Sequence, residues 1–163
     1  MEIVNDKLKI VGIVMLKKYR IGFDIFGLLL FLLIMIPNFI WFAVSAPNDV
    51  LRVESFTPII DGIGSVSQVV FIATIYILKR KGVDKIRFSK LLILSLAMVI
   101  AYFMGWILYY SGIVNPIVII LLTIPPCMAF ILYAVDRKNV IATILTVIFT
   151  VCHVTYEAVN YIV

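Results

Sequence analysis

Residues 21–46 read IGFDIFGLLLFLLIMIPNFIWFAVSA, a run in which Asp24 is the only charged side chain. Since an α-helix rises about 1.5 Å per residue and the apolar core of a bilayer is about 30 Å thick, about 20 apolar residues are enough to cross it. The segment before the run lacks the short apolar stretch and the small-residue cleavage site of a signal peptide. The run therefore predicts a retained membrane span that is long enough to tilt.

The rest of the chain has the same character. Of its 163 residues, 64% are hydrophobic and 14% are charged, and the mean hydropathy is +1.16. A soluble domain is usually about half apolar and about a quarter charged. This chain has too little polar surface to cover a water-soluble globule, so we expect lipid around most of it and no separate soluble domain.

Turn and capping signals divide the chain into further spans. Pro47-Asn48-Asp49 and Ser111-Gly112 are turn signals. Thr57-Pro58 and Asn115-Pro116 each place a capping residue before a proline at the first helical position, and Ser89 is a further cap. The predicted spans are residues 21–46, 58–78, 90–110, 115–135 and 140–162. They form a single membrane domain, residues 21–163, after an N-terminal segment of residues 1–20.

Lysine and arginine fall almost entirely on one side of this predicted topology. The segments 1–20, 79–90 and 136–139 hold five, six and two of them, so 13 of the 14 share a side and only Arg52 lies on the other. By the positive-inside rule, this predicts a multi-pass protein of the cell membrane with its N-terminus in the cytoplasm and its C-terminus outside. We expect these charges to contact anionic lipids at the cytoplasmic face. Nucleic-acid binding would need a motif that the chain lacks, so we expect none.

Residues 3–16 are apolar but are interrupted by Asp6, Lys7 and Lys9. The stretch is too short to span a bilayer, and its pattern favours an amphipathic helix lying on the inner membrane surface. The predicted fold class is thus an all-α integral membrane protein, a five-transmembrane-helix bundle with an N-terminal amphipathic interfacial helix.

Polar residues inside spans are costly in lipid, so each is a candidate for function. On the predicted topology nearly all of them lie in the outer half of the membrane, whereas the inner half is mostly Leu, Ile, Val and Phe. We therefore expect a polar cavity in the outer half of the bundle. The predicted ligand-binding residues are Asn38, Asp61, Gln68, Tyr102, Trp106, His153 and Glu157.

His153 and Glu157 form the sharpest pair among these residues. At positions i and i+4 they share one helix face, where a carboxylate can hold the imidazole or both can reach a metal or a proton. This spacing also arises often by chance. The alternative is that Glu157 is hydrated near the outer interface and His153 is a hydrogen-bonded packing residue.

The polar residues of the second span have different explanations. Asp61 lies in the first turn, where the helix dipole favours a carboxylate, and its functional alternative is as a partner for His153 or for a cationic ligand. Gln68 lies near mid-span, so it needs an interhelical hydrogen bond or a ligand. Gly62 and Gly64 make one face small, which favours close helix packing and could serve a homodimer.

The chain carries none of the common catalytic motifs. It has no P-loop, no G-x-S-x-G, no H-E-x-x-H and no haem attachment sequence. Cys127 and Cys152 lie in apolar runs and are expected to be free thiols. We predict no catalytic residue and no metal site, and the pattern leaves any cofactor open.

Five spans in about this length resemble the tryptophan-rich sensory (translocator) protein family in gross architecture. That family has many tryptophans and a characteristic Trp/Pro-containing first loop. This chain has two tryptophans and reads Ser45-Ala46-Pro47-Asn48-Asp49 at that place. The resemblance is one of size, and it implies no residue roles.

Three hypotheses for function follow. The leading one is a small polytopic membrane protein that binds or moves a small, partly apolar or cationic molecule through the outer-half cavity. The second is a structural or regulatory membrane subunit without a ligand. The third is an intramembrane enzyme that uses His153 and Glu157 as a base or metal pair.

Overall fold

The structure is a computed structural model, and it describes residues 17–52, 56–83, 85 and 87–162. Five helices in this part of the chain are long and apolar enough to cross a membrane. They are α2 (Ile25–Ala43), α3 (Pro58–Ile77), α4 (Lys90–Tyr110), α5 (Pro116–Asp136) and α6 (Val140–Glu157), and α6 continues into a π-helical turn, η2 (Ala158–Ile162). The predicted five-helix bundle is confirmed. The amphipathic helix predicted for residues 3–16 lies outside the described residues.

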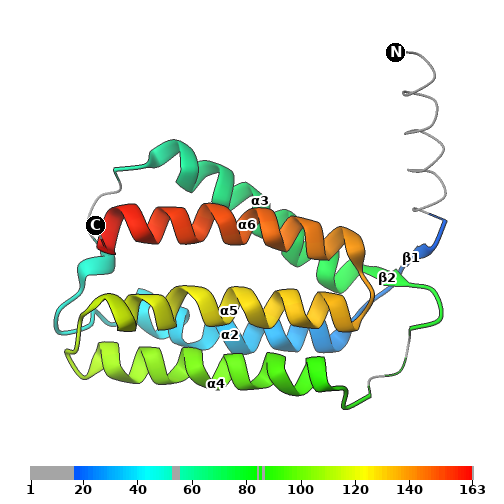
Figure 1. The fold of residues 1–163 in the computed structure, drawn as a ribbon, viewed down its shortest axis with the longest axis horizontal. Coiled ribbons are helices and arrows are strands. Elements are labelled where there is room, and N and C mark those ends of the chain that lie inside the picture. Colours follow the sequence, from blue (N-terminus) through cyan, green and yellow to red (C-terminus); the bar gives the residue numbers. More distant parts are fainter. Residues whose placement is uncertain (1–16, 53–55, 84, 86, 163) are drawn as a thin grey trace.

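The helices pack as two pairs joined by one further contact. α3 lies along α6, α4 lies along α5, and α5 packs against α6 to join the pairs, while α2 contacts α3, α4 and α5 less extensively (Figure 1). α4 and α5 approach closely at Gly105, where an added Cβ would lie 2.9 Å from the Cβ of Leu121. Only residues 111–115 connect α4 to α5, and the two helices are antiparallel neighbours.

The first helix is shorter than the predicted span of residues 21–46. It begins at Ile25 because the Asp24 side chain accepts a hydrogen bond from the Gly27 N–H, and it ends at Ala43 before an extended Val44. Residues ahead of it form a strand, β1 (Tyr19–Ile21), which pairs in antiparallel fashion with β2 (Leu78–Arg80) at the end of α3. The bundle is all-α apart from this one pair of three-residue strands, which the sequence did not predict. Each segment gives the other backbone partners that it would otherwise lack.

Side chains cap most of the helices as predicted. The Ser89 hydroxyl accepts from Leu92 N–H at 3.1 Å, and the Asn115 side chain accepts from Val118 N–H at 3.0 Å. Thr57 does not cap α3 with its side chain. Its hydroxyl instead accepts a hydrogen bond from the Asn160 amide at 2.8 Å, which joins the start of α3 to η2.

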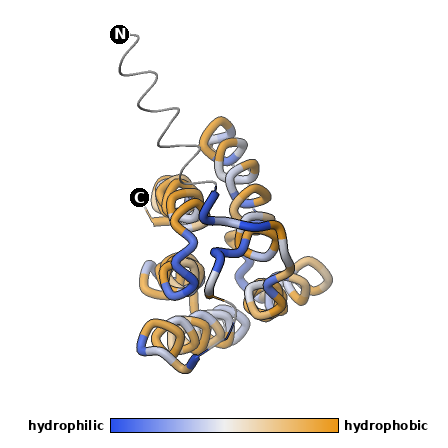
Figure 2. The backbone as a smooth tube through the Cα atoms, turned by 90° about the vertical axis from the view of Figure 1, so that its right-hand side faces the viewer, coloured by the Kyte–Doolittle hydropathy of each residue, from blue (hydrophilic) through white to orange (hydrophobic). Residues whose placement is uncertain are grey.

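The two ends of the bundle differ, and we name them for what they carry. The strand end carries β1, β2 and the α5–α6 turn, whereas the loop end carries residues 44–52, the α4–α5 turn and the C-terminus (Figure 1). Viewed along the helices from the strand end, the tube is apolar around every helix and polar mainly in the connections (Figure 2). Exposed side chains such as Ile59, 77% exposed, and Val69, 70% exposed, form this apolar surface. Such a surface suits contact with lipid tails.

The face of α3 that was predicted to carry small residues includes Gly62 and Gly64, and these two glycines have different surroundings. Gly64 is buried, and an added Cβ would lie 3.6 Å from the Cβ of Cys152 on α6, so close helix packing is found there. At Gly62 an added Cβ would meet nothing within 4 Å, and this glycine lies in a shallow apolar groove with Ile59 and Ile63. A homodimer through this face stays a prediction.

Candidate functional site

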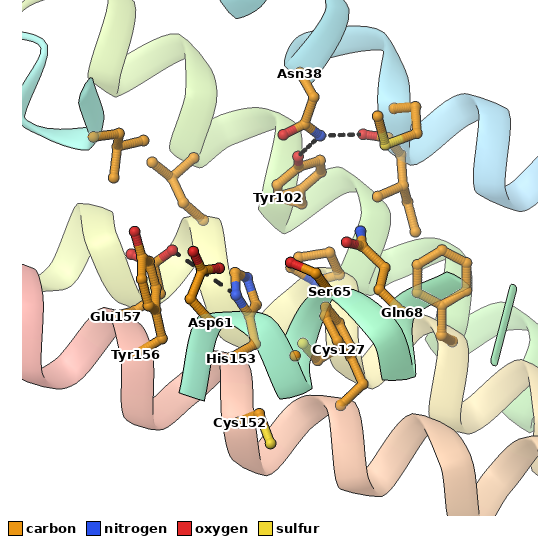
Figure 3. A pocket seen from close by; sticks show the side chains of 18 of the residues that line it. Asn38, Asp61, Ser65, Gln68, Tyr102, Cys127, Cys152, His153, Tyr156 and Glu157 are labelled. Atoms are coloured by element: carbon orange, nitrogen blue, oxygen red, sulfur yellow. Dashed lines mark hydrogen bonds and ion pairs between the residues drawn. The ribbon is translucent and has the colours of Figure 1, made fainter. Parts of the chain in front are cut away.

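One cavity of about 370 Å³ lies among all five helices, in the half of the bundle nearer the loop end (Figure 3). Its volume falls within the range of small-molecule sites, about 300–1,000 Å³. All seven residues singled out from the sequence line it, and they come from four different helices. These residues are Asn38, Asp61, Gln68, Tyr102, Trp106, His153 and Glu157.

Helical spacing brings these side chains to the cavity. On α3 the lining residues Asp61, Ser65 and Gln68 follow one another at intervals of four and three, and on α6 His153 and Glu157 are four apart. Side chains at such intervals share one helix face. Figure 3 shows Asp61, His153 and Glu157 on one side of the cavity and Asn38 and Tyr102 across from them. We call the first group the acidic wall.

The acidic wall holds an incompletely paired carboxylate. Glu157 Oε1 lies 3.9 Å from His153 Nδ1, which is too far for a hydrogen bond. Glu157 Oε2 is buried and has no hydrogen-bond partner in the described structure. The His153 ring stacks on Phe149, with ring centroids 5.2 Å apart and planes 15° apart. The predicted shared face is present, but the carboxylate does not hold the imidazole through a hydrogen bond.

Asp61, Ser65 and Gln68 face the cavity from α3. Asp61 and Ser65 are exposed and Gln68 is half-buried, so the cavity is open to small molecules on this side. The Gln68 amide makes no hydrogen bond within the described residues. The described residues therefore do not supply the interhelical hydrogen bond that its mid-span position requires, and a ligand or water in the cavity can supply it.

The opposite side of the cavity consists of Asn38, Tyr102 and Trp106, which we call the donor wall. The Asn38 side-chain amide donates to the Ile34 carbonyl at 3.1 Å and to the Tyr102 hydroxyl oxygen at 2.6 Å. Trp106 is 6% exposed, its ring packs edge-on against Tyr102, and its Nε1–H makes no hydrogen bond in the described structure. Trp106 thus forms part of the cavity wall, and its role in binding a ligand stays a prediction.

The rest of the lining decides which ligands the cavity suits. It is mostly aliphatic and aromatic, and it includes the free thiols of Cys127 and Cys152. No lysine or arginine lines the cavity in the part of the chain that the structure describes. Nor do the described residues contain any group of three His, Cys, Asp or Glu side chains that could hold a metal ion.

At the loop end a polar cluster around Asp49 holds the segment that follows α2. Trp41, which lines the cavity, donates from Nε1 to Asp49 Oδ1 at 2.9 Å, and the Tyr109 hydroxyl donates to the same oxygen at 2.9 Å. Arg52 Nε donates to Asp49 Oδ2 at 2.8 Å, and its guanidinium lies 4.8 Å from the Trp41 ring centroid. The sequence identified this segment only as a turn. Arg52, the one basic residue predicted on the outer side, lies three residues after Asp49. This spacing is the sequence signal that could have indicated the cluster.

Asp49 gives a prediction for the dependence of stability on pH. Burial alone would raise the pKa of its carboxyl, but hydrogen bonds from Trp41, Arg52, Tyr109 and the Ala46 N–H outweigh burial and hold the pKa below its usual value. The carboxylate therefore stabilises the fold above its unfolded pKa, and this stabilisation is lost as the pH falls through the lower folded pKa. We expect the thermal midpoint of the protein in detergent to exceed that of Asp49→Asn by a constant amount above about pH 4 and by less in more acidic buffer. A gap that stays constant down to pH 2 would contradict this.

At the strand end a second buried cluster joins α2 to α5. The Tyr133 hydroxyl donates to Asp24 Oδ1 at 2.9 Å, and Arg137 Nε donates to Asp24 Oδ2 at 3.1 Å. Arg137 also donates to the carbonyls of Val83 at 2.8 Å and Lys85 at 3.2 Å. This cluster lies away from the cavity, and its charged groups are paired, so it is a structural feature and not a second binding site.

Comparison with known proteins gives no further guide to function. No protein-family model, no curated protein and no solved structure matches this chain. The likeness to the tryptophan-rich sensory proteins therefore stays one of size. What the protein does must be inferred from the cavity and the side chains that line it.

Proposed function

We propose that this chain is a multi-pass protein of the cell membrane that binds a small, partly apolar cation in the cavity between its five helices. Its N-terminus lies in the cytoplasm, and the cavity opens in the outer half of the bilayer. The segregation of 13 of 14 basic residues supports this orientation. The described basic segments, residues 17–20, 79–81 and 137–138, also lie together at the strand end (Figure 1).

The observation that carries the proposal is the charge of the cavity. Two carboxylates, Asp61 and Glu157, line it together with His153, no lysine or arginine of the described residues does so, and one oxygen of Glu157 is buried without a hydrogen-bond partner there. A buried carboxylate is stable only when it is neutralised or paired. A bound cation supplies the missing charge and, if it carries N–H groups, the missing hydrogen bond.

The remaining walls suit the apolar part of such a ligand. Trp41, Phe42, Tyr102 and Trp106 present aromatic rings to the cavity, and aromatic faces attract organic cations as well as apolar groups. The aliphatic lining from α2 and α5 contacts the remainder of the ligand. A carrier and a sensor must both bind the ligand. Binding can therefore be tested before transport and sensing are told apart.

The test uses two probes of nearly the same shape. Benzyltrimethylammonium carries a charge, and neopentylbenzene is its neutral counterpart. Both tryptophans of the chain line the cavity, so intrinsic fluorescence reports occupancy directly. With the protein in nanodiscs of uncharged lipid, we expect saturable binding of the cation and at least tenfold weaker binding in Glu157→Gln, because a charge-assisted contact is worth about 1.5–3 kcal/mol.

Asp136→Asn is the matched control, since this carboxylate lies outside the cavity and accepts a hydrogen bond from Ser89. It should leave the affinity for the cation unchanged. Equal affinity for the two probes, or unchanged binding by a folded Glu157→Gln protein, would show that the carboxylates do not recognise charge. If Glu157→Gln lowers the thermal midpoint and binds normally, Glu157 is a structural residue.

A further inference from the structure

The donor wall of the cavity has a hydrogen-bonding requirement opposite to that of the acidic wall. Indole Nε1–H can only donate, and that of Trp106 is buried beside the Tyr102 hydroxyl, with which it makes no hydrogen bond of good geometry. An unsatisfied buried donor is costly, and the cost is recovered when an acceptor reaches it. Trp106 is 6% exposed, so bulk solvent does not supply that acceptor in the closed bundle.

The neighbouring Tyr102 hydroxyl has the same requirement. The Asn38 side-chain nitrogen is identified by its contact with the Ile34 carbonyl, which can only accept a hydrogen bond. The same nitrogen lies 2.6 Å from the Tyr102 hydroxyl oxygen, so this oxygen accepts. The hydroxyl hydrogen of Tyr102 then has no acceptor among the described residues. Two donor hydrogens from α4 thus lack a well-aligned acceptor among the described residues.

We propose that the ligand is bifunctional, with its cationic group against Glu157 and Asp61 and a hydrogen-bond acceptor, such as a carbonyl or ether oxygen, against Trp106 and Tyr102. This inference rests on the proposed function, and it narrows the ligand class to organic ammonium compounds that carry an oxygen acceptor across a short apolar body. The two walls face each other across one continuous cavity (Figure 3). Trp106 is then the specificity-determining residue at the acceptor end.

Two further probes isolate the acceptor. (4-Acetylbenzyl)trimethylammonium carries a ketone on the far side of its ring from the ammonium group, and (4-ethylbenzyl)trimethylammonium has a methylene in place of that ketone. Radiolabelled probes and equilibrium dialysis against nanodiscs keep the readout independent of tryptophan. We expect the ketone to bind about tenfold more tightly than the methylene compound, because the latter leaves the donors unpaired.

Single substitutions in the two walls show which residues cause the preference for the ketone probe. Trp106→Phe should reduce the ratio of the two affinities to near one, mainly by weakening the ketone, whereas Glu157→Gln should weaken both probes by the same factor. Tyr102→Phe keeps the ring and removes only the hydroxyl, so it should lower the ratio of the two affinities in part. This variant tests the inference if Trp106→Phe does not fold. Equal binding of both probes by the unaltered protein would overturn this inference and leave the proposed function standing. Failure of both probes to bind would overturn the proposed function itself.

Discussion

Replacing Asp24 by alanine is expected to lower the free energy of unfolding by about 3–5 kcal/mol, because it leaves the buried guanidinium of Arg137 without its counter-charge. Both side chains of this ion pair are enclosed, with 6% and 7% of their surfaces exposed, and the pair joins the start of α2 to the end of α5. Tyr133 would lose its acceptor at the same time. For a chain of this length, such a loss lowers the thermal midpoint by about 6–20 °C.

The measurement can use the protein's own buried thiol. Cys127 is 1% exposed, so a thiol-reactive dye added during heating in detergent reports the unfolding of the helix core. Arg137→Met alone should also destabilise, but Asp24→Ala with Arg137→Met should lose clearly less than the sum of the two single changes, because no unpaired charge remains. Lys90→Ala, at an exposed position, is the control and should change the midpoint little. Simple additivity would show that the ion pair does not couple the two helices.

Replacing Gly105 by alanine is expected to cost about 1–3 kcal/mol by overpacking the α4–α5 contact. The new Cβ would lie 2.9 Å from the Leu121 Cβ and 3.2 Å from the Leu121 backbone carbon. Backbone cannot move aside as a flexible side chain does, so the two helices must separate. Because Trp106 is the next residue on α4, we also expect a shift in the tryptophan emission spectrum.

Gly62→Ala is the matched control for this change. Gly62 is also in a membrane-spanning helix, but an added Cβ would meet nothing within 4 Å. Alanine favours the helix over glycine, so this variant should be as stable as the parent or slightly more stable. The same dye assay compares the two. If both alanine variants had the same midpoint as the parent, close packing at Gly105 would not limit stability.

The helices could be predicted from the sequence because their signals are local. A continuous apolar run defines a span, and Ser89 and Asn115 precede their helices with the side-chain oxygen that the first turn needs. The polar positions on the cavity could also be predicted, since residues spaced three or four apart share a helix face and a polar side chain avoids lipid. Seven residues chosen in this way line one cavity.

The pairing of buried polar side chains between helices could not be predicted, because it depends on which distant helices pack together. The Asp24–Arg137 pair joins residues 113 positions apart, and nothing in the neighbouring sequence of either residue indicates the other. The same holds for Tyr109 of α4, whose hydroxyl donates a hydrogen bond to Asp49 in the segment that follows α2. The strand pairing was missed because Tyr19–Ile21 lies where the basic N-terminal segment meets the first apolar run and carries no strand pattern of its own, and only its proximity to residues 78–80 makes it a strand.

The β1–β2 pairing has a consequence for how the chain is assembled during its synthesis. Its two strands flank α2 and α3, so both are synthesised before the first residue of α4. Their register, with Tyr19 opposite Arg80, fixes the relative position of these two helices at one end. The first helical hairpin therefore has its own means of alignment, which needs no later helix. The later helices α4, α5 and α6 can then pack against two helices whose relative position is already fixed.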